Sequence, residues 1–201
     1  MAEADEERCL IEAGQKGDIA AFNQLVLNYQ GRVYQVCYRM LGDAEGAADA
    51  TQDTFFSVFR NLGRFRGGSF RAWVLRIATN TCYDVLRARK RRPTTSLDAA
   101  LEADEAGRSL DPPDPGEPPD ETVLRRELGA AIQRGLAELP DDQRLVIVLS
   151  DIQGLSYQEI AHITEANLGT VKSRLSRGRA RLRDILKEME LLPSRYRHHG
   201  E

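Results

Sequence analysis

Apolar residues recur every three to four positions through most of the first 92 residues, which is the period of amphipathic α-helices. A first such stretch spans residues 22–41 and ends at Gly42, a residue type that commonly follows a helix. Asp43 can cap the next helix, which a loop of sequence RFRGG (64–68) follows. Ser69 can then cap a third, long helix that ends in RARKRRP (87–93), because its proline disfavours continuation. The residues expected to face inward are Phe22, Leu25, Val26, Tyr29, Val33, Val36, Cys37, Met40 and Leu41 in the first helix, Thr51, Phe55, Val58, Phe59 and Leu62 in the second, and Phe70, Trp73, Val74, Ile77, Cys82 and Val85 in the third.

The same period returns after Asp120, which can cap a further helix that breaks at Pro140. A second helix of this half ends at Gly154. The sequence SYQE (156–159) then forms an S-x-x-E capping box, which predicts the start of a short helix over 156–163. A turn at 164–167 leads into a long helix. The inward residues are expected to be Leu124, Leu128, Ala131, Ile132 and Leu139, then Leu145, Val146, Leu149 and Ile152, then Ile160 and Ile163, and then Val171, Leu175, Leu182, Ile185 and Met189.

Six of the eight prolines lie between residues 93 and 119, where acidic residues also dominate. Proline-rich sequence cannot form a helix interior and is typical of extended linkers. We therefore predict an all-α chain of two small helical domains joined by a flexible, acidic, proline-rich linker, with a helix-turn-helix in the second domain. The predicted ranges are 1–92 and 121–192 for the domains, 93–120 for the linker and 193–201 for a tail.

Charge is unevenly distributed along the chain although the net charge is only −3. Residues 60–92 hold ten bases and one acid, and residues 171–187 hold seven bases and one acid. Two basic blocks separated by an acidic spacer favour two contacts with one polyanion, and the plainer alternative is that both are solvated helix faces.

Several classes of protein do not fit the sequence. No apolar run approaches the roughly 20 residues that span a bilayer, and the acidic first residues lack the pattern of a secretion signal, so we expect a cytoplasmic protein without membrane insertion. Cys9, Cys37 and Cys82 are widely spaced and form no CxxC motif, which argues against a disulfide framework or a zinc site. No Walker, HExxH or G-x-S-x-G motif is present. We expect no enzyme, no cofactor and no bound metal.

A short capped helix, a tight turn and a basic helix in succession are typical of a helix-turn-helix. In the long helix, four residues share one face by their i, i+1, i+4 and i+5 spacing, and this face is expected to contact base edges in the major groove. Three further arginines are placed to contact phosphates, which adds affinity without sequence information. The base-contacting set is Lys172, Ser173, Ser176 and Arg177; the phosphate set is Arg174, Arg179 and Arg181; Thr170 joins the expected DNA contacts at the start of the helix.

The long helix that follows the RFRGG loop carries a second candidate surface. Arg76, Asn80, Tyr83 and Arg87 are spaced four, three and four residues apart and form one outward stripe, with Trp73 at its edge. Cations, an amide and an aromatic together suit unpaired DNA, because aromatics stack on bases and arginines neutralise phosphate. Simple core packing is the alternative for Trp73, and a plain exposed residue is the alternative for Asn80.

Two segments resemble a known family. The segment 49–87, with the motifs D-x-x-Q-D-x-F and FRG…F-x-x-W-x-x-R-I-A-x-N, resembles region two of extracytoplasmic-function sigma factors of the sigma-70 family. The segment 139–186, with GLSYQEIA…GTVKSRLSR, resembles their region four. The resemblance implies a sigma factor that binds core RNA polymerase and directs promoter-specific transcription initiation.

The resemblance also implies roles for matching residues. In the family, a region-two helix binds a coiled coil of the largest polymerase subunit, and the matching residues are Asp49, Gln52, Asp53 and Phe56. The family's loop and third helix melt and read the minus-ten element, where the match is Phe65, Arg66, Ser69, Trp73 and Asn80. Region four reads the minus-thirty-five element, here with Lys172, Ser173, Ser176 and Arg177. Expected partners are therefore core polymerase, including the flap of its second-largest subunit, promoter DNA and an anti-sigma factor.

The sequence departs from the family pattern at two positions. The loop FRGGSF lacks the acidic residue that follows the first glycine in many relatives and is one residue shorter, so its pocket is expected to differ in shape. Glu165 stands where relatives often have glycine. If that residue adopts a positive φ, the glutamate carries about 1 kcal/mol of strain.

Two other functional classes fit the sequence less well. A helix-turn-helix repressor or activator would need neither an acidic docking helix nor a stripe suited to single strands. A site-specific recombinase would need a nucleophilic serine or tyrosine with an arginine cluster in a catalytic domain, for which the first domain is too small. Co-purification with core polymerase would separate the sigma factor from both.

Overall fold

The computed structural model describes residues 2–91 and 119–189, and within these ranges the chain is helical and contains no strand. The described helices form two compact units, α1–α4 and α5–α8. The predicted tail and all of the predicted linker up to residue 118 lie outside the described residues. Among the described helices, none is both long enough and apolar enough to cross a membrane.

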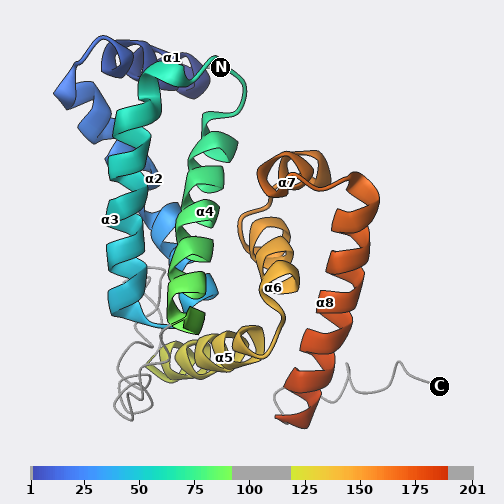
Figure 1. Ribbon diagram of the computed structural model, residues 1–201. Helices are drawn as coiled ribbons and strands as arrows, with labels where there is room; N and C mark the ends of the chain where they lie inside the picture. The colour runs from blue at the N-terminus through green and yellow to red at the C-terminus, as the bar shows by residue number, and fades with distance from the viewer. Residues whose placement is uncertain (1, 92–118, 190–201) are drawn as a thin grey trace. The chain divides into compact units, whose positions relative to one another are not determined.

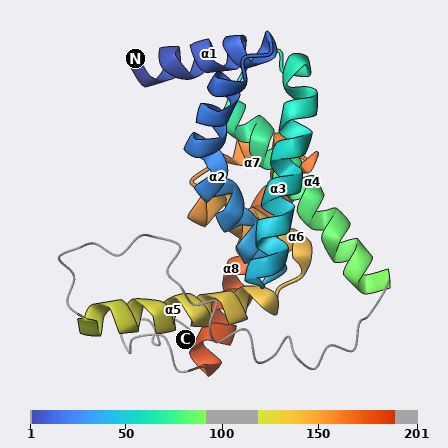
Figure 2. The same ribbon diagram turned by 90° about the vertical axis from the view of Figure 1, so that its left-hand side faces the viewer.

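The first unit contains α1 (Ala2–Gln15), α2 (Ile19–Leu41), α3 (Ala44–Asn61), the 3₁₀ turn η1 (Leu62–Arg64) and α4 (Phe70–Arg91). Helices α2, α3 and α4 run alongside one another, and α1 crosses near one end of them (Figures 1 and 2). Three of these helices match the predicted ones. Helix α1 was not predicted, because its largely polar sequence has a weak apolar period.

The core of this unit lies between α2 and α4. Val33, Val36 and Cys37 of α2 and Val74 and Cys82 of α4 are completely buried. The Cys82 thiol has a raised pKa because of its hydrogen bond with Cys37 and its burial. Both residues therefore behave as the small buried groups that the sequence predicts, whereas Cys9 is exposed.

The prediction for one face of α3 is wrong at Phe59. The 3.6-residue period places Phe59 inward, but 47% of this residue is exposed. Its ring packs edge-on against Phe22, with 4.9 Å between the ring centroids. The apolar period therefore identifies Phe59 as part of an apolar face of α3. It does not show that this face is left uncovered in the described unit.

The second unit contains α5 (Pro119–Ala137), α6 (Asp141–Ile147), the π-helical turn η4 (Val148–Ile152), α7 (Tyr157–Thr164) and α8 (Leu168–Glu188). Helix α5 begins at Pro119, so Asp120 lies within its first turn rather than at the predicted cap. Leu128, which was predicted to face inward, is 47% exposed. The C-terminal carbonyl groups near the end of α5 accept hydrogen bonds from the buried Arg144 guanidinium, which reaches Leu136 O at 2.8 Å.

The helix-turn-helix is formed by α7 and α8, and local signals in the sequence explain both helix starts. Ser156 and Glu159 form the predicted capping box at the start of α7. The Asn167 side chain accepts a hydrogen bond from the Thr170 backbone N–H at 2.7 Å and caps α8. Between them, Glu165 adopts a left-handed conformation with φ of 52°. This conformation costs a non-glycine residue about 1 kcal/mol.

Candidate nucleic-acid interface

Helix α8 divides into a buried side and an exposed basic side. Val171, Leu175 and Gly178 are buried against the rest of the second unit. The four residues predicted to contact bases are all exposed on the other side: Lys172, Ser173, Ser176 and Arg177. Arg177 lies along the helix surface, where its Nε donates to the Ser173 carbonyl at 3.3 Å. The packing of α8 thus leaves the predicted base-contacting face open to solvent.

Two arginines predicted to contact phosphates form ion pairs within the unit. Arg174 Nε lies 2.9 Å from Asp142 Oδ2. Arg179 binds Asp151 in a bidentate manner, with Nε to Oδ2 at 3.0 Å and Nη2 to Oδ1 at 2.5 Å. The hydrogen bonds to Asp151 raise the pKa of Arg179 despite its partial burial. A role of Arg174 and Arg179 at phosphates stays a prediction. Both side chains also connect α8 to the helical segment before α7. Arg181, the third of this set, is exposed.

The π-helical turn η4 positions the acidic partner of Arg179. In this turn the backbone N–H of Gln153 donates to the carbonyl of Val148, five residues earlier, at 2.9 Å. Such turns insert one residue into a helix and frequently occur at functional sites. Here the turn contains Ser150 and Asp151, and both side chains hydrogen-bond Arg179.

Helix α8 packs closely against α6 at Gly178. A Cβ atom at this position would lie 2.9 Å from Ile147 Cδ1 and 3.3 Å from Gln143 Cβ. Gly178 separates Arg177, on the exposed face, from Arg179, in the ion pair with Asp151. Its missing side chain therefore sets how closely the basic helix approaches the rest of the unit.

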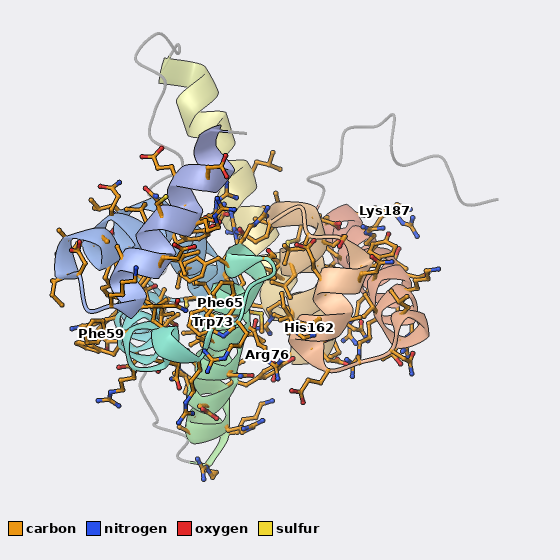
Figure 3. The ribbon with its side chains drawn as sticks, turned by 90° about the horizontal axis from the view of Figure 1, so that it is seen from above. Phe59, Phe65, Trp73, Arg76, His162 and Lys187 are labelled. Carbon is orange, nitrogen blue, oxygen red and sulfur yellow. The ribbon has the colours of Figure 1, made fainter. Side chains whose placement is uncertain are left out.

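In the first unit, the predicted stripe follows the outer side of α4. Asn80 and Arg87 are exposed, and Arg76 and Tyr83 are half-buried. Arg87 pairs with Asp84 one turn away at 3.0 Å. The described positions therefore agree with one continuous surface of cations, an amide and an aromatic along this helix. Figure 3 shows Arg76 on the same helix as Trp73.

An aromatic cluster lies where the loop enters α4. The rings of Phe65, Phe70 and Trp73 are 5.3–5.6 Å apart between centroids. Phe70 is buried, whereas Phe65 and Trp73 are half-buried and lie beside each other in Figure 3. Trp73 is thus both a packing residue and a residue at the surface, so the two interpretations of its sequence position are compatible.

The loop before α4 is held by its own backbone and side chains. Ser69 Oγ accepts a hydrogen bond from the Ala72 N–H at 3.1 Å, which confirms Ser69 as the cap of α4. Arg66 donates to the Gly63 carbonyl at 2.7 Å. Gly67 and Gly68 both have positive φ, which glycine adopts without strain.

The four residues predicted to bind polymerase lie on the exposed side of α3: Asp49, Gln52, Asp53 and Phe56. Gln52 and Phe56 also line an apolar groove of about 480 Å³ between α2 and α3. Phe56 is 56% exposed. The rest of the groove is lined mainly by apolar side chains, namely Ile19, Phe22, Val26, Ala48, Phe55 and Phe59.

Two features of these surfaces were not predicted from the sequence. The groove requires α2 and α3 to leave a face uncovered, which the apolar period alone does not report. The ion pair between Arg179 and Asp151 joins residues 28 positions apart, so no local spacing indicates it. The sequence signal available for the groove was the apolar face of each helix, which includes Phe22 of α2 and Phe59 of α3.

Comparison with known proteins finds matches to the same protein family in both units. Residues 25–92 match the family described as Sigma-70 region 2, and residues 129–182 match Sigma-70, region 4. The RNA polymerase sigma-H factor of Pseudomonas aeruginosa is 38% identical over 185 residues, which cover 89% of this chain and 93% of the relative. The ECF RNA polymerase sigma-E factor of Escherichia coli is 39% identical over 182 residues, with the same coverage.

A solved structure resembles the chain as well. It is the sigma factor RpoE of Bartonella quintana, in a co-crystal with the anti-sigma factor NepR. The TM-score is 0.64 at 26% identity, and the match covers 84% of this chain and 98% of that chain.

Proposed function

This chain belongs to the extracytoplasmic-function (ECF) sigma factors of the sigma-70 family, and we propose that its two units divide the work of promoter recognition. As a sigma factor it directs promoter-specific transcription initiation by RNA polymerase. Because the chain belongs to this family, the two alternatives, a repressor or activator and a recombinase, are rejected. The division of labour rests above all on one observation: α4 presents an aromatic cluster followed by a stripe of cations and an amide.

The exposed face of α3 is the proposed docking site for core polymerase. Asp49 and Asp53 supply negative charge there, and Gln52 and Phe56 border the apolar groove. A mixed surface of this kind suits a basic amphipathic partner, since interfaces combine an apolar centre with charged margins. The proposed partner is the coiled coil of the largest polymerase subunit.

The loop and α4 are proposed to open and read the minus-ten element. The half-buried rings of Phe65 and Trp73 can stack on a base that has left the duplex. Gly67 and Gly68, which lie between these residues in the sequence, leave the loop backbone accessible. Arg76 and Arg87 supply charge for the phosphates, and Asn80 has the donors and acceptor to read a base edge. Ser69, Arg66 and Tyr83 complete the proposed minus-ten set.

The exposed face of α8 is proposed to read the minus-thirty-five element in the major groove. Lys172 and Arg177 can donate to guanine acceptors, and Ser173 and Ser176 can contact either base type. Thr170, Arg174, Arg179 and Arg181 are proposed to contact the backbone, which gives affinity rather than selectivity. For Arg174 and Arg179 this contact requires rearrangement or sharing of their present ion pairs.

The remaining partners follow from the family. The similar fold of a sigma factor crystallised with its anti-sigma factor supports an anti-sigma partner for this chain. The flap of the second-largest polymerase subunit is the proposed contact for the second unit. We place the protein in the cytoplasm, where a sigma factor meets its polymerase, and assign it no chemistry of its own.

Promoter opening by an Asn80→Ala holoenzyme tests the role of the α4 stripe. The promoter is first chosen by run-off transcription of genomic fragments with wild-type holoenzyme. Permanganate footprinting then reports unpaired thymines, and filter binding reports the closed complex. We expect Asn80→Ala to spare closed binding and to reduce opening about ten- to hundredfold, since lost hydrogen bonds to a buried base cost about 1–3 kcal/mol.

The matched control is Asn28→Ala, which removes an exposed amide from α2 in the same unit. This control should open the promoter like the wild type. Equal opening by Asn80→Ala and Asn28→Ala would show that Asn80 is a plain surface residue.

A further inference from the structure

Helix α1 is joined to the loop that precedes α4 by one side chain. The Gln15 side-chain amide nitrogen donates to the Leu62 carbonyl and to the Phe65 carbonyl, each at 3.0 Å. The two carbonyls lie at the beginning and just past the end of η1. One NH₂ group has two donors, and here both are used on the turn that presents the Phe65 ring.

Close packing accompanies these hydrogen bonds. A Cβ atom at Gly14 would lie 2.9 Å from Leu62 Cδ2, which is shorter than real side chains tolerate. Leu62 is 2% exposed. The glycine thus lets α1 approach the 3₁₀ turn closely enough for Gln15 to reach both carbonyls.

The other half of α1 contacts the same aromatic cluster through α2. The Tyr29 hydroxyl donates to Glu7. Burial, which is the larger cause, and this hydrogen bond raise the pKa of Tyr29, so the hydroxyl stays protonated. The Tyr29 ring packs edge-on against Phe70, with 5.5 Å between centroids. Phe70 in turn contacts Phe65 and Trp73.

We infer that α1 is a positioning element for promoter opening and that Gln15 is its positioning residue, which holds the 62–65 turn so that Phe65 stays against Trp73. The inference rests on the proposed role of the loop at the minus-ten element. Gln15 lies outside the residues that match the region-two family, 25–92. It is exposed and contributes little burial, so its expected effect comes from the two hydrogen bonds.

A first experiment measures the turn in the free full-length chain. Trp73 is the chain's single tryptophan, so acrylamide quenching of its fluorescence reports how well Phe65 covers it. Gln15→Leu removes both donors and should make Trp73 more accessible to acrylamide. Gln15→Lys keeps a donor of similar reach, so Trp73 in this variant should remain largely protected from acrylamide.

The matched control is Gln24→Leu, because the Gln24 amide donates to Asn28, one turn away on the same helix. This control should quench like the wild type. Equal quenching by Gln15→Leu and Gln24→Leu would overturn the inference that Gln15 holds the turn.

A second experiment follows opening by reconstituted holoenzyme on the promoter chosen by run-off transcription. Gln15→Leu should leave core binding and closed-complex affinity unchanged and reduce the closed-to-open equilibrium about tenfold, as expected for two lost neutral hydrogen bonds. A merely structural role would instead weaken core binding too. Opening equal to that of the Gln24→Leu holoenzyme would refute a positioning role in opening.

Phe65→Ala, tested in parallel, separates this inference from the proposed function. If Phe65→Ala opened the promoter normally, the loop itself would have no role there and the proposed function of the loop would fail. The quenching comparison would still decide whether Gln15 holds the turn, because it involves no DNA.

Discussion

Replacing Asp151 with asparagine should make binding to the upstream promoter element tighter at low salt and more sensitive to salt, because the change releases Arg179. Asparagine keeps the size of the side chain and removes its charge. The Arg179 and Asp151 side chains are 46% and 37% exposed. A pair this exposed stabilises the unit by only about 0.5–1 kcal/mol, so the variant should remain folded.

The expected size of the effect follows from counterion release. Each additional phosphate contact steepens the slope of log K against log salt by about 0.9. Over a fourfold increase in salt, the affinity of Asp151→Asn should therefore fall about three- to fourfold more than that of the wild type. Fluorescence anisotropy with reconstituted holoenzyme and labelled duplex promoter, below the opening temperature, measures both slopes.

Two controls test the cause. Glu138→Gln makes the same change of charge at an exposed position just after the end of α5 and should leave the slope near that of the wild type. Adding Arg179→Ala to Asp151→Asn should lower the slope to the wild-type value or below it, because the contact of Arg179 with a phosphate is then lost. A slope for Asp151→Asn equal to that of the wild type would show that the ion pair with Asp151 does not restrain Arg179 from a phosphate.

Three other substitutions probe docking, selectivity and packing. Reversing Asp49 and Asp53 to lysine should abolish binding to core polymerase in a pull-down without loss of helicity by circular dichroism, and retained binding would remove α3 as the docking site. Arg177→Ala should cost about 1–3 kcal/mol at one base position of the upstream element; a uniform loss over all positions in a selection from randomised promoters would exclude a base contact. Gly178→Ala gains about 1 kcal/mol of helix propensity but overpacks α6 at a cost of about 1–3 kcal/mol, so thermal unfolding should show net destabilisation. Gly129→Ala, with nothing within 4 Å of its Cβ position, should instead stabilise by about 0.4–1 kcal/mol, and equal shifts for both glycines would contradict the packing at Gly178.

Interactions between close neighbours in the sequence could be predicted. The Ser156–Glu159 capping box joins residues three positions apart, and the Ser69 cap joins its side chain to the Ala72 N–H. Their geometry depends on a single helical turn, so the spacing of residue types is sufficient evidence. The positive φ at Glu165 was considered from the sequence only as a condition, because relatives often have glycine at this position.

Interactions across the fold could not be predicted in this way. Gln15 bonds carbonyls 47 and 50 positions away, and Arg179 pairs with an aspartate 28 positions away. Their partners depend on how helices pack, which the residue period does not specify. The period also marks Phe59 as apolar without showing that its face is uncovered, and it cannot distinguish the π turn η4 from the end of an ordinary helix.

The most direct test of the central claim is the affinity of reconstituted holoenzyme for a single-stranded oligonucleotide that carries the downstream element of the non-template strand. The reference is an oligonucleotide of the same length and composition with that element scrambled. We predict that wild-type holoenzyme prefers the cognate strand and that Asn80→Ala lowers this preference about ten- to hundredfold, because the amide reads a base that only an unpaired strand exposes. Equal affinity for the cognate and scrambled strands, or an unchanged preference in Asn80→Ala, would contradict the claim that α4 reads unpaired promoter DNA.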